Sequence, residues 1–188
     1  MPAPRASYES ALVILVPEAE VFVERTRQRY DPSAAIGMPA HITINYPYLP
    51  GERVYAETID QLRVLFSRFP PLRFKLAEAR RFFDTVYLAP EPAGPIMDLI
   101  RAVAVRYPQS PPYGGMFAEV VPHLSLAQSE NEAELELVLR EFAPGSEGKL
   151  PIEATADGVW LMDNQNGRWQ KRIAFRLGRS LFHRARPV

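Results

Sequence analysis

A short pattern that pairs an imidazole with a hydroxyl occurs once in each half of the chain. The two copies are His41-Ile42-Thr43-Ile44 and His123-Leu124-Ser125-Leu126. Side chains alternate between the two faces of a β-strand. The histidine and the hydroxyl of each copy therefore share one face, and the two aliphatic residues share the other. Each copy predicts a strand that is buried on one side and presents a histidine and a hydroxyl on the other.

These four polar side chains are suited to acid–base chemistry on a phosphate. Histidines with an ordinary pKa near ~6.5 provide one neutral and one protonated imidazole close to neutral pH. We therefore predict that His41 and His123 form a catalytic acid–base pair. The hydroxyls of Thr43 and Ser125 can donate hydrogen bonds to the non-bridging oxygens of a phosphoryl group. Such a site suits cyclic phosphates and RNA-type phosphodiesters, and it needs neither a metal nor a cofactor.

The remaining histidine and the absence of cysteine argue against a metal site. His183 has Ala185 at the position where each motif has a hydroxyl, so we interpret it as structural. The chain has three histidines, no cysteine and no HxH or HExxH spacing, which excludes thiolate sites and disfavours zinc. We predict no bound metal.

The composition is that of a globular protein of one compact domain or two small lobes. Of the 188 residues, 47% are hydrophobic and 23% are charged, which is enough for a packed core. The formal net charge is zero. This argues against broad electrostatic binding of nucleic acid, although a neutral total is compatible with a local basic groove. No pattern points to an obligate protein partner.

The N-terminal residues do not resemble a targeting or membrane segment. Residues 1–10 lack the basic start and apolar run of a secretory signal, and the apolar stretch 11–16 is too short to cross a bilayer. We therefore expect a cytoplasmic protein that does not bind membranes.

Hydrophobic periodicity and Pro/Gly punctuation predict the same series of elements twice. In the first half we expect a strand at 11–16, a helix at 18–30, the motif strand at 40–46, a helix at 54–69 and a strand at 72–79. In the second half we expect a strand at 81–89, a helix at 95–107, a Pro/Gly loop at 108–115, the motif strand after 122 and a helix at 131–142. We expect Ser129 or Asn131 to cap this last helix. A long hairpin of strands 150–162 and 168–177 completes the chain.

The repeated order predicts an internal duplication with pseudo-two-fold symmetry. We expect residues 1–188 to form a single α+β domain of two lobes, with approximate halves 10–80 and 81–177. Each lobe would contribute one motif strand to a shared cleft.

The two motifs and their flanks resemble the 2H phosphoesterase superfamily, and within it the 2′-5′ RNA ligase (LigT-like) family. The segments that carry the resemblance are Pro39-Ala40-His41-Ile42-Thr43-Ile44, Pro112-Tyr113-Gly114-Gly115 and Val121-Pro122-His123-Leu124-Ser125. Ser125 replaces the more common threonine but keeps the hydroxyl. The resemblance implies two pseudo-symmetric lobes with antiparallel sheets around a central cleft and helices on the outside. It also implies metal-independent chemistry on 2′,3′-cyclic, 1″,2″-cyclic or 2′-5′-linked nucleotides.

Further side chains are candidates for substrate contact. If the alternation of the first motif strand continues, Asn45 lies on the same face as His41 and Thr43. Four aromatic residues in strands or loops near the motifs are candidates for stacking on a base, with core or surface packing as the simpler interpretation of each: Tyr46, Phe83, Tyr113 and Trp169. The strands expected at 72–79 and 81–89 are also predicted to form a hairpin. Four basic residues in this hairpin and in the C-terminal one are candidates for a phosphate clamp, with solvated strand edges as the simpler interpretation: Arg80, Arg81, Arg168 and Lys171.

The predicted function is metal-independent hydrolysis of a 2′,3′-cyclic phosphate on an RNA 3′ end or a small cyclic nucleotide. The neutral charge and short chain favour small or terminal substrates. ATP-independent joining of RNA ends through a 2′-5′ bond uses the same groups in reverse and remains an alternative. The third candidate function is that of a module that binds nucleotide or RNA in the same cleft without turnover.

Overall fold

The computed structural model describes residues 8–117, 119–143, 145 and 149–178. His183, which we interpret as structural, lies outside these ranges. The elements in chain order, with η for a 3-10 helix, are β1 (Ser10–Leu15), α1 (Pro17–Tyr30), α2 (Pro32–Ala35), β2 (His41–Asn45), η1 (Gly51–Arg53), α3 (Ala56–Phe66), β3 (Leu72–Arg81), β4 (Thr85–Glu91), α4 (Gly94–Arg106), η2 (Pro112–Gly115), β5 (Leu124–Gln128), α5 (Glu132–Glu141), β6 (Ile152–Ala156), β7 (Gly158–Asp163) and β8 (Gln170–Arg176).

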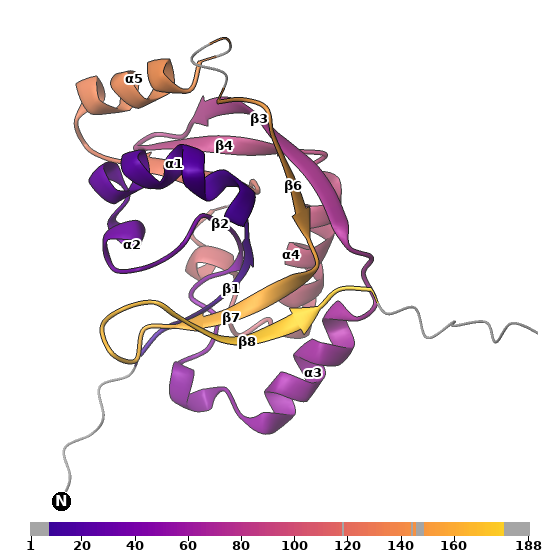
Figure 1. Cartoon of the computed structure of the whole chain (residues 1–188). Helices are drawn as coiled ribbons and strands as arrows, with labels where there is room; N and C mark the ends of the chain where they lie inside the picture. Colours follow the sequence, from indigo (N-terminus) through magenta and orange to yellow (C-terminus); the bar gives the residue numbers. More distant parts are fainter. Residues whose placement is uncertain (1–7, 118, 144, 146–148, 179–188) are drawn as a thin grey trace, which may run out of the picture.

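The strands form two four-stranded sheets, which confirms the predicted α+β class (Figure 1). Sheet A has the order β2-β1-β7-β8, sheet B has the order β5-β4-β3-β6, and all neighbours are antiparallel. The two motif strands, β2 and β5, occupy the same edge position in their sheets. They lie next to one another, so both motifs meet where the sheets adjoin.

The sheets do not correspond to the expected halves 10–80 and 81–177. Strand β3 pairs with β4 and β6 in sheet B, and the C-terminal hairpin β7-β8 returns to sheet A beside β1. The single strand expected at 150–162 is likewise two strands, β6 in sheet B and β7 in sheet A, divided at Asp157. The apolar alternation runs through this division, so periodicity alone does not reveal the change of sheet.

The burial of strand β1 explains why the C-terminal hairpin β7-β8 pairs with it in sheet A. Its residues are almost all buried, because Leu12 and Ile14 face the main core while Ala11 and Val13 face a second apolar cluster. A strand buried on both faces is stable as an inner strand with a hydrogen-bonded neighbour on each edge. Strand β2 fills one edge and β7 fills the other.

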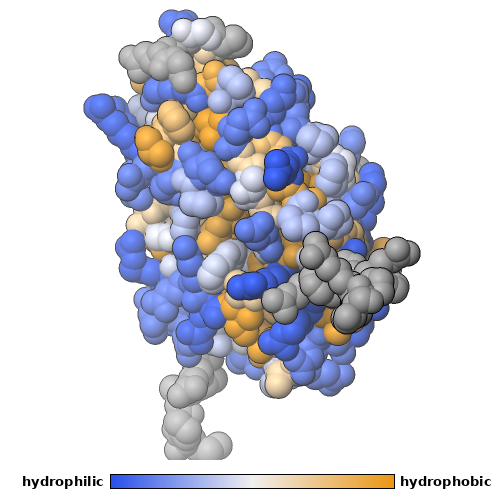
Figure 2. Space-filling view, turned by 45° about the vertical axis from the view of Figure 1, so that its right-hand side comes forward, coloured by the Kyte–Doolittle hydropathy of each residue, from blue (hydrophilic) through white to orange (hydrophobic). Residues whose placement is uncertain are grey.

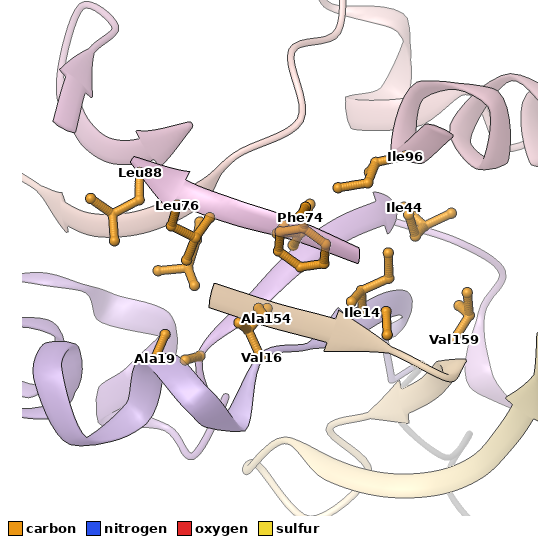
Figure 3. Packing of buried hydrophobic residues seen from close by; sticks show 14 of the residues in the cluster. Ile14, Val16, Ala19, Ile44, Phe74, Leu76, Leu88, Ile96, Ala154 and Val159 are labelled. Carbon is orange, nitrogen blue, oxygen red and sulfur yellow. The ribbon is translucent and has the colours of Figure 1, made fainter. Parts of the chain in front are cut away.

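One continuous core joins the two sheets. Figure 3 shows Ile14 and Ile44 of sheet A close to Phe74 and Ala154 of sheet B. Burying apolar surface between the sheets stabilises the fold and fixes their relative position. Because β2 and β5 each turn their aliphatic residues to this core, their polar residues face the opposite side.

The helices cover the sheets, and two of them pack against strands of the other lobe. Helix α1 follows β1 but packs on β5 and β6 of sheet B, while α4 follows β4 but packs on β2 of sheet A. Helix α3 lies beside β8 at one end of the molecule, and α5 lies over sheet B at the other (Figure 1). The expected cap of α5 is Asn131, whose side chain accepts a hydrogen bond from the amide of Ala133. The crossing of α1 brings its C-terminal end close to both motif strands.

The face of the molecule shown in Figure 2 is largely hydrophilic. Hydrophobic residues on this face occur in small groups among polar ones (Figure 2). No helix in the described part of the chain is long and apolar enough to span a bilayer.

Replacement of Gly158 tests how tightly the return of the chain to sheet A is packed. A Cβ atom at this position would lie 2.7 Å from the carbonyl oxygen of Phe175 in β8. We expect Gly158→Ala to lower the free energy of unfolding by about 1–3 kcal/mol, because the backbone must move to relieve the overlap. Gly94→Ala is the matched control, since no atom lies within 4 Å of its added Cβ. Urea unfolding measures both, and equal stabilities would contradict the prediction.

Candidate active site

The two motif strands place all four predicted polar side chains around one cavity. His41, Thr43, His123 and Ser125 line a space of about 320 Å³. Residues directly opposite in an antiparallel pair share a face, and Thr43 lies opposite Val13, which also lines the cavity. The structure therefore brings together residues from distant parts of the sequence, with the hydroxyl of each motif next to its histidine on the strand.

Both imidazoles are held in the same orientation by their own backbone. Nδ1 of His41 lies 2.8 Å from the carbonyl oxygen of Pro39, and Nδ1 of His123 lies 2.7 Å from that of Val121. A carbonyl oxygen only accepts hydrogen bonds, so Nδ1 carries the proton in both rings. In the neutral form this leaves Nε2 with a free lone pair, the requirement for a general base. In the protonated form Nε2–H is the donor that a general acid needs.

The surroundings of both histidines favour the neutral form. Burial lowers the pKa of His41 to about 4, and the positive charge of Arg27 contributes to this shift. Burial also lowers the pKa of His123. The carboxylate of Asp31 acts in the opposite direction on both rings by favouring the imidazolium. Before substrate binds, both rings are therefore predominantly neutral at pH 7.

A buried ion pair next to the cavity was not predicted from the sequence. Arg27 is 1% exposed, and its Nε and Nη2 donate to Oδ2 of Asp31 at 3.0 and 2.8 Å. The other oxygen of Asp31 accepts hydrogen bonds from the amide and hydroxyl of Ser33. Asp31 and Ser33 line the cavity. The spacing of four residues is a signal for a helix ion pair, but only the packing of α1 on β5 and β6 shows that the pair is buried.

Three aromatic rings lie around His123. Phe82 and Tyr87 stack with ring centroids 4.2 Å apart, and both present an edge or face to the His123 ring at 5.1 and 5.5 Å. Tyr113 lies nearly parallel to His123 at 6.4 Å. Phe82 and Tyr87 were not among the predicted site residues. The cavity is therefore asymmetric, with charged groups near His41 and aromatic groups near His123.

Three of the four aromatic candidates, Tyr46, Tyr113 and Trp169, line the cavity, whereas Phe83 does not line it and is 95% exposed. Tyr46 and Trp169 meet edge to face at 5.9 Å. The backbone of Tyr113 adopts the left-handed region, with φ of 53°, and its amide donates to the carbonyl of Tyr46 at 2.6 Å. Its side chain is hydrogen-bonded to Thr43. Tyr113 thus connects the loop before the second motif with the first motif strand.

Asn45 does not lie where the strand alternation predicts. Leu12 pairs with Asn45 while the next residue, Val13, pairs with Thr43, so the β1–β2 register slips by one residue at this point. Ile44 and Asn45 are consequently both buried, and Asn45 is not part of the cavity lining. Its Nδ2 donates to the carbonyl of Ser110 at 2.9 Å. Asn45 therefore fixes the loop before η2 and does not meet the expectation of a substrate contact.

The four basic candidates for a phosphate clamp also lie elsewhere, and none of them lines the cavity. Arg80 and Arg81 pair with Glu78 and Glu132. Arg168 donates to the carbonyl of Ala35, and Lys171 lies over the ring of Trp160. These contacts agree with the simpler interpretation of the four residues as strand-edge side chains.

Comparison with known sequences finds a family match over most of the chain. The family model of the 2′-5′ RNA ligase superfamily matches residues 15–168. "Putative phosphoesterase GK0864" of Geobacillus kaustophilus (strain HTA426) is 25% identical over 177 residues, which cover 88% of this chain and 95% of that protein. A "Putative phosphoesterase" of Geobacillus thermodenitrificans (strain NG80-2) is 26% identical over 166 residues, covering 84% and 88%.

Comparison with solved structures finds the same fold. The crystal structure of Escherichia coli LigT complexed with 3′-AMP superposes with a TM-score of 0.59 at 16% identity, covering 92% of this chain and 99% of that one. The crystal structure of TT0787 of Thermus thermophilus gives a TM-score of 0.56 at 17% identity, covering 90% and 97%. These similarities confirm the expected two-lobed LigT-like architecture.

The low pKa of His41 predicts a loss of stability in mild acid. The unfolded chain takes up a proton near pH ~6.5, while folded His41 stays neutral to about pH 4. The free energy of unfolding therefore falls as the pH falls through this window. His41→Asn removes this titration and preserves a donor to the Pro39 carbonyl. We expect the variant to lose less stability than the wild type between pH 7 and pH 4.5 in urea unfolding. A variant with the same pH dependence as the wild type would contradict the assignment.

Proposed function

The chain belongs to the 2′-5′ RNA ligase superfamily, and from this membership and the cavity geometry we propose that it hydrolyses 2′,3′-cyclic phosphates. The enzyme is of the phosphoesterase kind. One observation carries the proposal: two imidazoles with identical backbone hydrogen bonds, each with a hydroxyl two residues on, line one cavity.

The proposed reaction is a displacement at phosphorus. A water molecule attacks the phosphorus and forms a new P–O bond while its proton passes to Nε2 of one neutral histidine. The bond from phosphorus to one ribose oxygen breaks, and Nε2–H of the second, protonated histidine donates to that oxygen. The product is a phosphate monoester, and the two rings have exchanged their protonation states.

The asymmetry of the cavity favours His41 as the base. The guanidinium of Arg27 disfavours a second positive charge at His41, so this ring is the one that stays neutral. His123 lies among aromatic rings, whose faces attract a cation, and Arg27 does not contribute to its pKa shift. The negative charge of a bound phosphodiester acts against the effect of burial by raising the pKa of His123, and so favours its protonated form.

Thr43 and Ser125 are the proposed donors to the non-bridging oxygens. Each hydroxyl shares a strand face with its histidine, so the two hydroxyls approach a phosphate from both sheets. The hydrogen bond between Thr43 and Tyr113 positions one of them. Hydrogen bonds that strengthen as charge develops on these oxygens stabilise the transition state.

The cavity size and the related folds support a nucleotide as substrate. A volume of about 320 Å³ is at the lower end of the range for small-ligand sites. Tyr46, Tyr113 and Trp169 provide faces or edges for a base. Escherichia coli LigT, which shares the fold, has been crystallised with 3′-AMP, ATP and NADP+.

Joining of RNA ends uses the same residues. If a 5′-hydroxyl of RNA takes the place of water, the product is a 2′-5′ phosphodiester. The family description favours this as the second candidate function. Gel analysis of an RNA with a 2′,3′-cyclic end and a second RNA with a 5′-hydroxyl distinguishes the two, because joining gives a longer product and hydrolysis does not.

Histidine variants test the acid–base pair on 2′,3′-cyclic AMP in EDTA between pH 5 and pH 9. We expect His41→Ala and His123→Ala each to reduce kcat by at least about 100-fold, since each removes one proton transfer. In the residual activity, His41→Ala should lose the rise of rate with pH, and His123→Ala should lose the fall at high pH. Circular dichroism controls for folding.

Several outcomes would contradict this assignment. Near-wild-type turnover by either folded variant would exclude the paired mechanism. If His41→Ala instead lost the fall of rate at high pH and His123→Ala lost the rise, His123 would be the base and His41 the acid. Tight binding of the cyclic nucleotide by the wild type without any product would favour the non-catalytic binding module.

A further inference from the structure

The candidate active site continues into two further grooves on the molecular surface. Its cavity shares Asp31, Pro32 and Gln128 with a neighbouring groove of about 250 Å³. That groove shares Arg29 and Tyr30 with a larger one of about 630 Å³ between α1 and α5. The shared residues make one path from the two histidines, across the C-terminal end of α1, to the region between the helices.

The far end of this path is strongly basic. The groove between α1 and α5, which we call the α1–α5 groove, is lined by one carboxylate, Glu141, and by four cations: Arg25, Arg29, Arg140 and Lys149. Lys149 pairs with Glu141 at 2.7 Å. Arg25 and Arg29 are exposed and form no ion pair with any residue in the described ranges. They are four residues apart on α1, so their positions differ by a rise of about 6 Å on one helix face.

Tyr30 lies at the junction of the two grooves. Its side chain is half-buried, and the guanidinium of Arg29 lies over its ring at 5.0 Å. An aromatic face next to guanidinium groups is the arrangement with which proteins hold a single-stranded nucleic acid, because bases stack on the ring while the cations attract the phosphates.

Other grooves of similar size lack this excess of positive charge. The groove beside α3, of about 720 Å³, balances Arg68 and Arg106 with Glu57 and Asp60. A groove of about 530 Å³ next to Trp160 has one cation, Lys171, among three carboxylates: Glu18, Glu20 and Asp157. The excess of cations therefore occurs in the α1–α5 groove, which connects with the cavity only through the intervening groove lined by Arg29, Asp31 and Glu134.

We propose that the α1–α5 groove binds the backbone of an oligonucleotide whose 3′ end reaches His41 and His123. This rests on the proposed function and specifies its substrate class as an RNA end with several nucleotides upstream. The terminal cyclic phosphate lies in the cavity, the next nucleotides cross Tyr30, and upstream phosphates contact Arg25 and Arg29. A mononucleotide fills the cavity alone and cannot reach the groove.

The double variant Arg25→Gln/Arg29→Gln tests this on two substrates, 2′,3′-cyclic AMP and a twelve-nucleotide RNA with a 2′,3′-cyclic end. In the wild type we expect a higher kcat/KM on the RNA. In the variant we expect the ratio of kcat/KM for RNA to that for mononucleotide to fall about tenfold at low salt, since two phosphate contacts are lost. Arg68→Gln/Arg106→Gln is the control, because it removes the same charge at the α3 groove, at the opposite end from α5 (Figure 1). It should leave the ratio at the wild-type value.

Direct binding makes the test independent of turnover. Fluorescence anisotropy with a labelled twelve-nucleotide RNA ending in a 3′-phosphate measures Kd at several salt concentrations. We expect the slope of log K against log salt to be smaller by about 1.4 in the Arg25/Arg29 variant than in the wild type and the control, or about 0.7 for each lost phosphate contact.

The outcomes separate the two proposals. An unchanged salt slope, or an equal loss in the control variant, overturns the groove assignment. A specific loss of RNA binding in an enzyme that turns over neither substrate supports the groove and overturns the proposed function. Wild-type activity on cyclic AMP without any preference for the RNA supports the proposed function and overturns the groove.

Discussion

The placement of two sheet edges side by side is the constraint on which the structure depends. Strands β2 and β5 are each hydrogen-bonded on one side only, and each needs its aliphatic face covered by a common core. Packing the two sheets around that core satisfies both requirements. Alternation then turns His41, Thr43 and Ser125 to the cavity side, and His123, just before β5, lines the same cavity. The chemistry of the cavity follows from hydrophobic packing on its reverse side.

Symmetry explains what the two histidines share, and helix α1 explains how they differ. Each ring donates from Nδ1 to the carbonyl two residues earlier, a local interaction that the repeated motif creates in both lobes. Helix α1 breaks this equivalence by crossing to the other sheet and burying Arg27 and Asp31 near His41. A buried ion pair contributes little net stability once desolvation is counted. Stability therefore does not explain why the Arg27–Asp31 pair is buried here. Its charges act on the pKa of the neighbouring imidazoles, which core packing alone would not do.

Helix α1 contributes residues both to the surroundings of His41 and to the proposed RNA-binding groove. One side of its last two turns carries the buried Arg27, and another carries the exposed Arg25 and Arg29. The neutral net charge of the chain favours small or terminal substrates only if charge is evenly distributed. Folding gathers cations in the α1–α5 groove and acidic residues around another groove. The net charge of the whole chain averages the basic and acidic regions. A bound polyanion interacts mainly with the protein charges that lie within a Debye length of it.

Local patterns in the chain were enough to identify the motif strands, their polar faces, the helices around them and the four residues of the proposed chemistry. Strand alternation, helix periodicity and proline breaks are all local properties. The folded molecule was needed to show that residues 150–162 divide between two sheets and that a register slip buries Asn45. It was also needed to place four further residues at or beside the cavity: Arg27, Asp31, Phe82 and Tyr87. Pairing register, burial and the contacts of crossing helices depend on residues far apart in the chain. Periodicity within one segment contains no information on which distant segment packs against it.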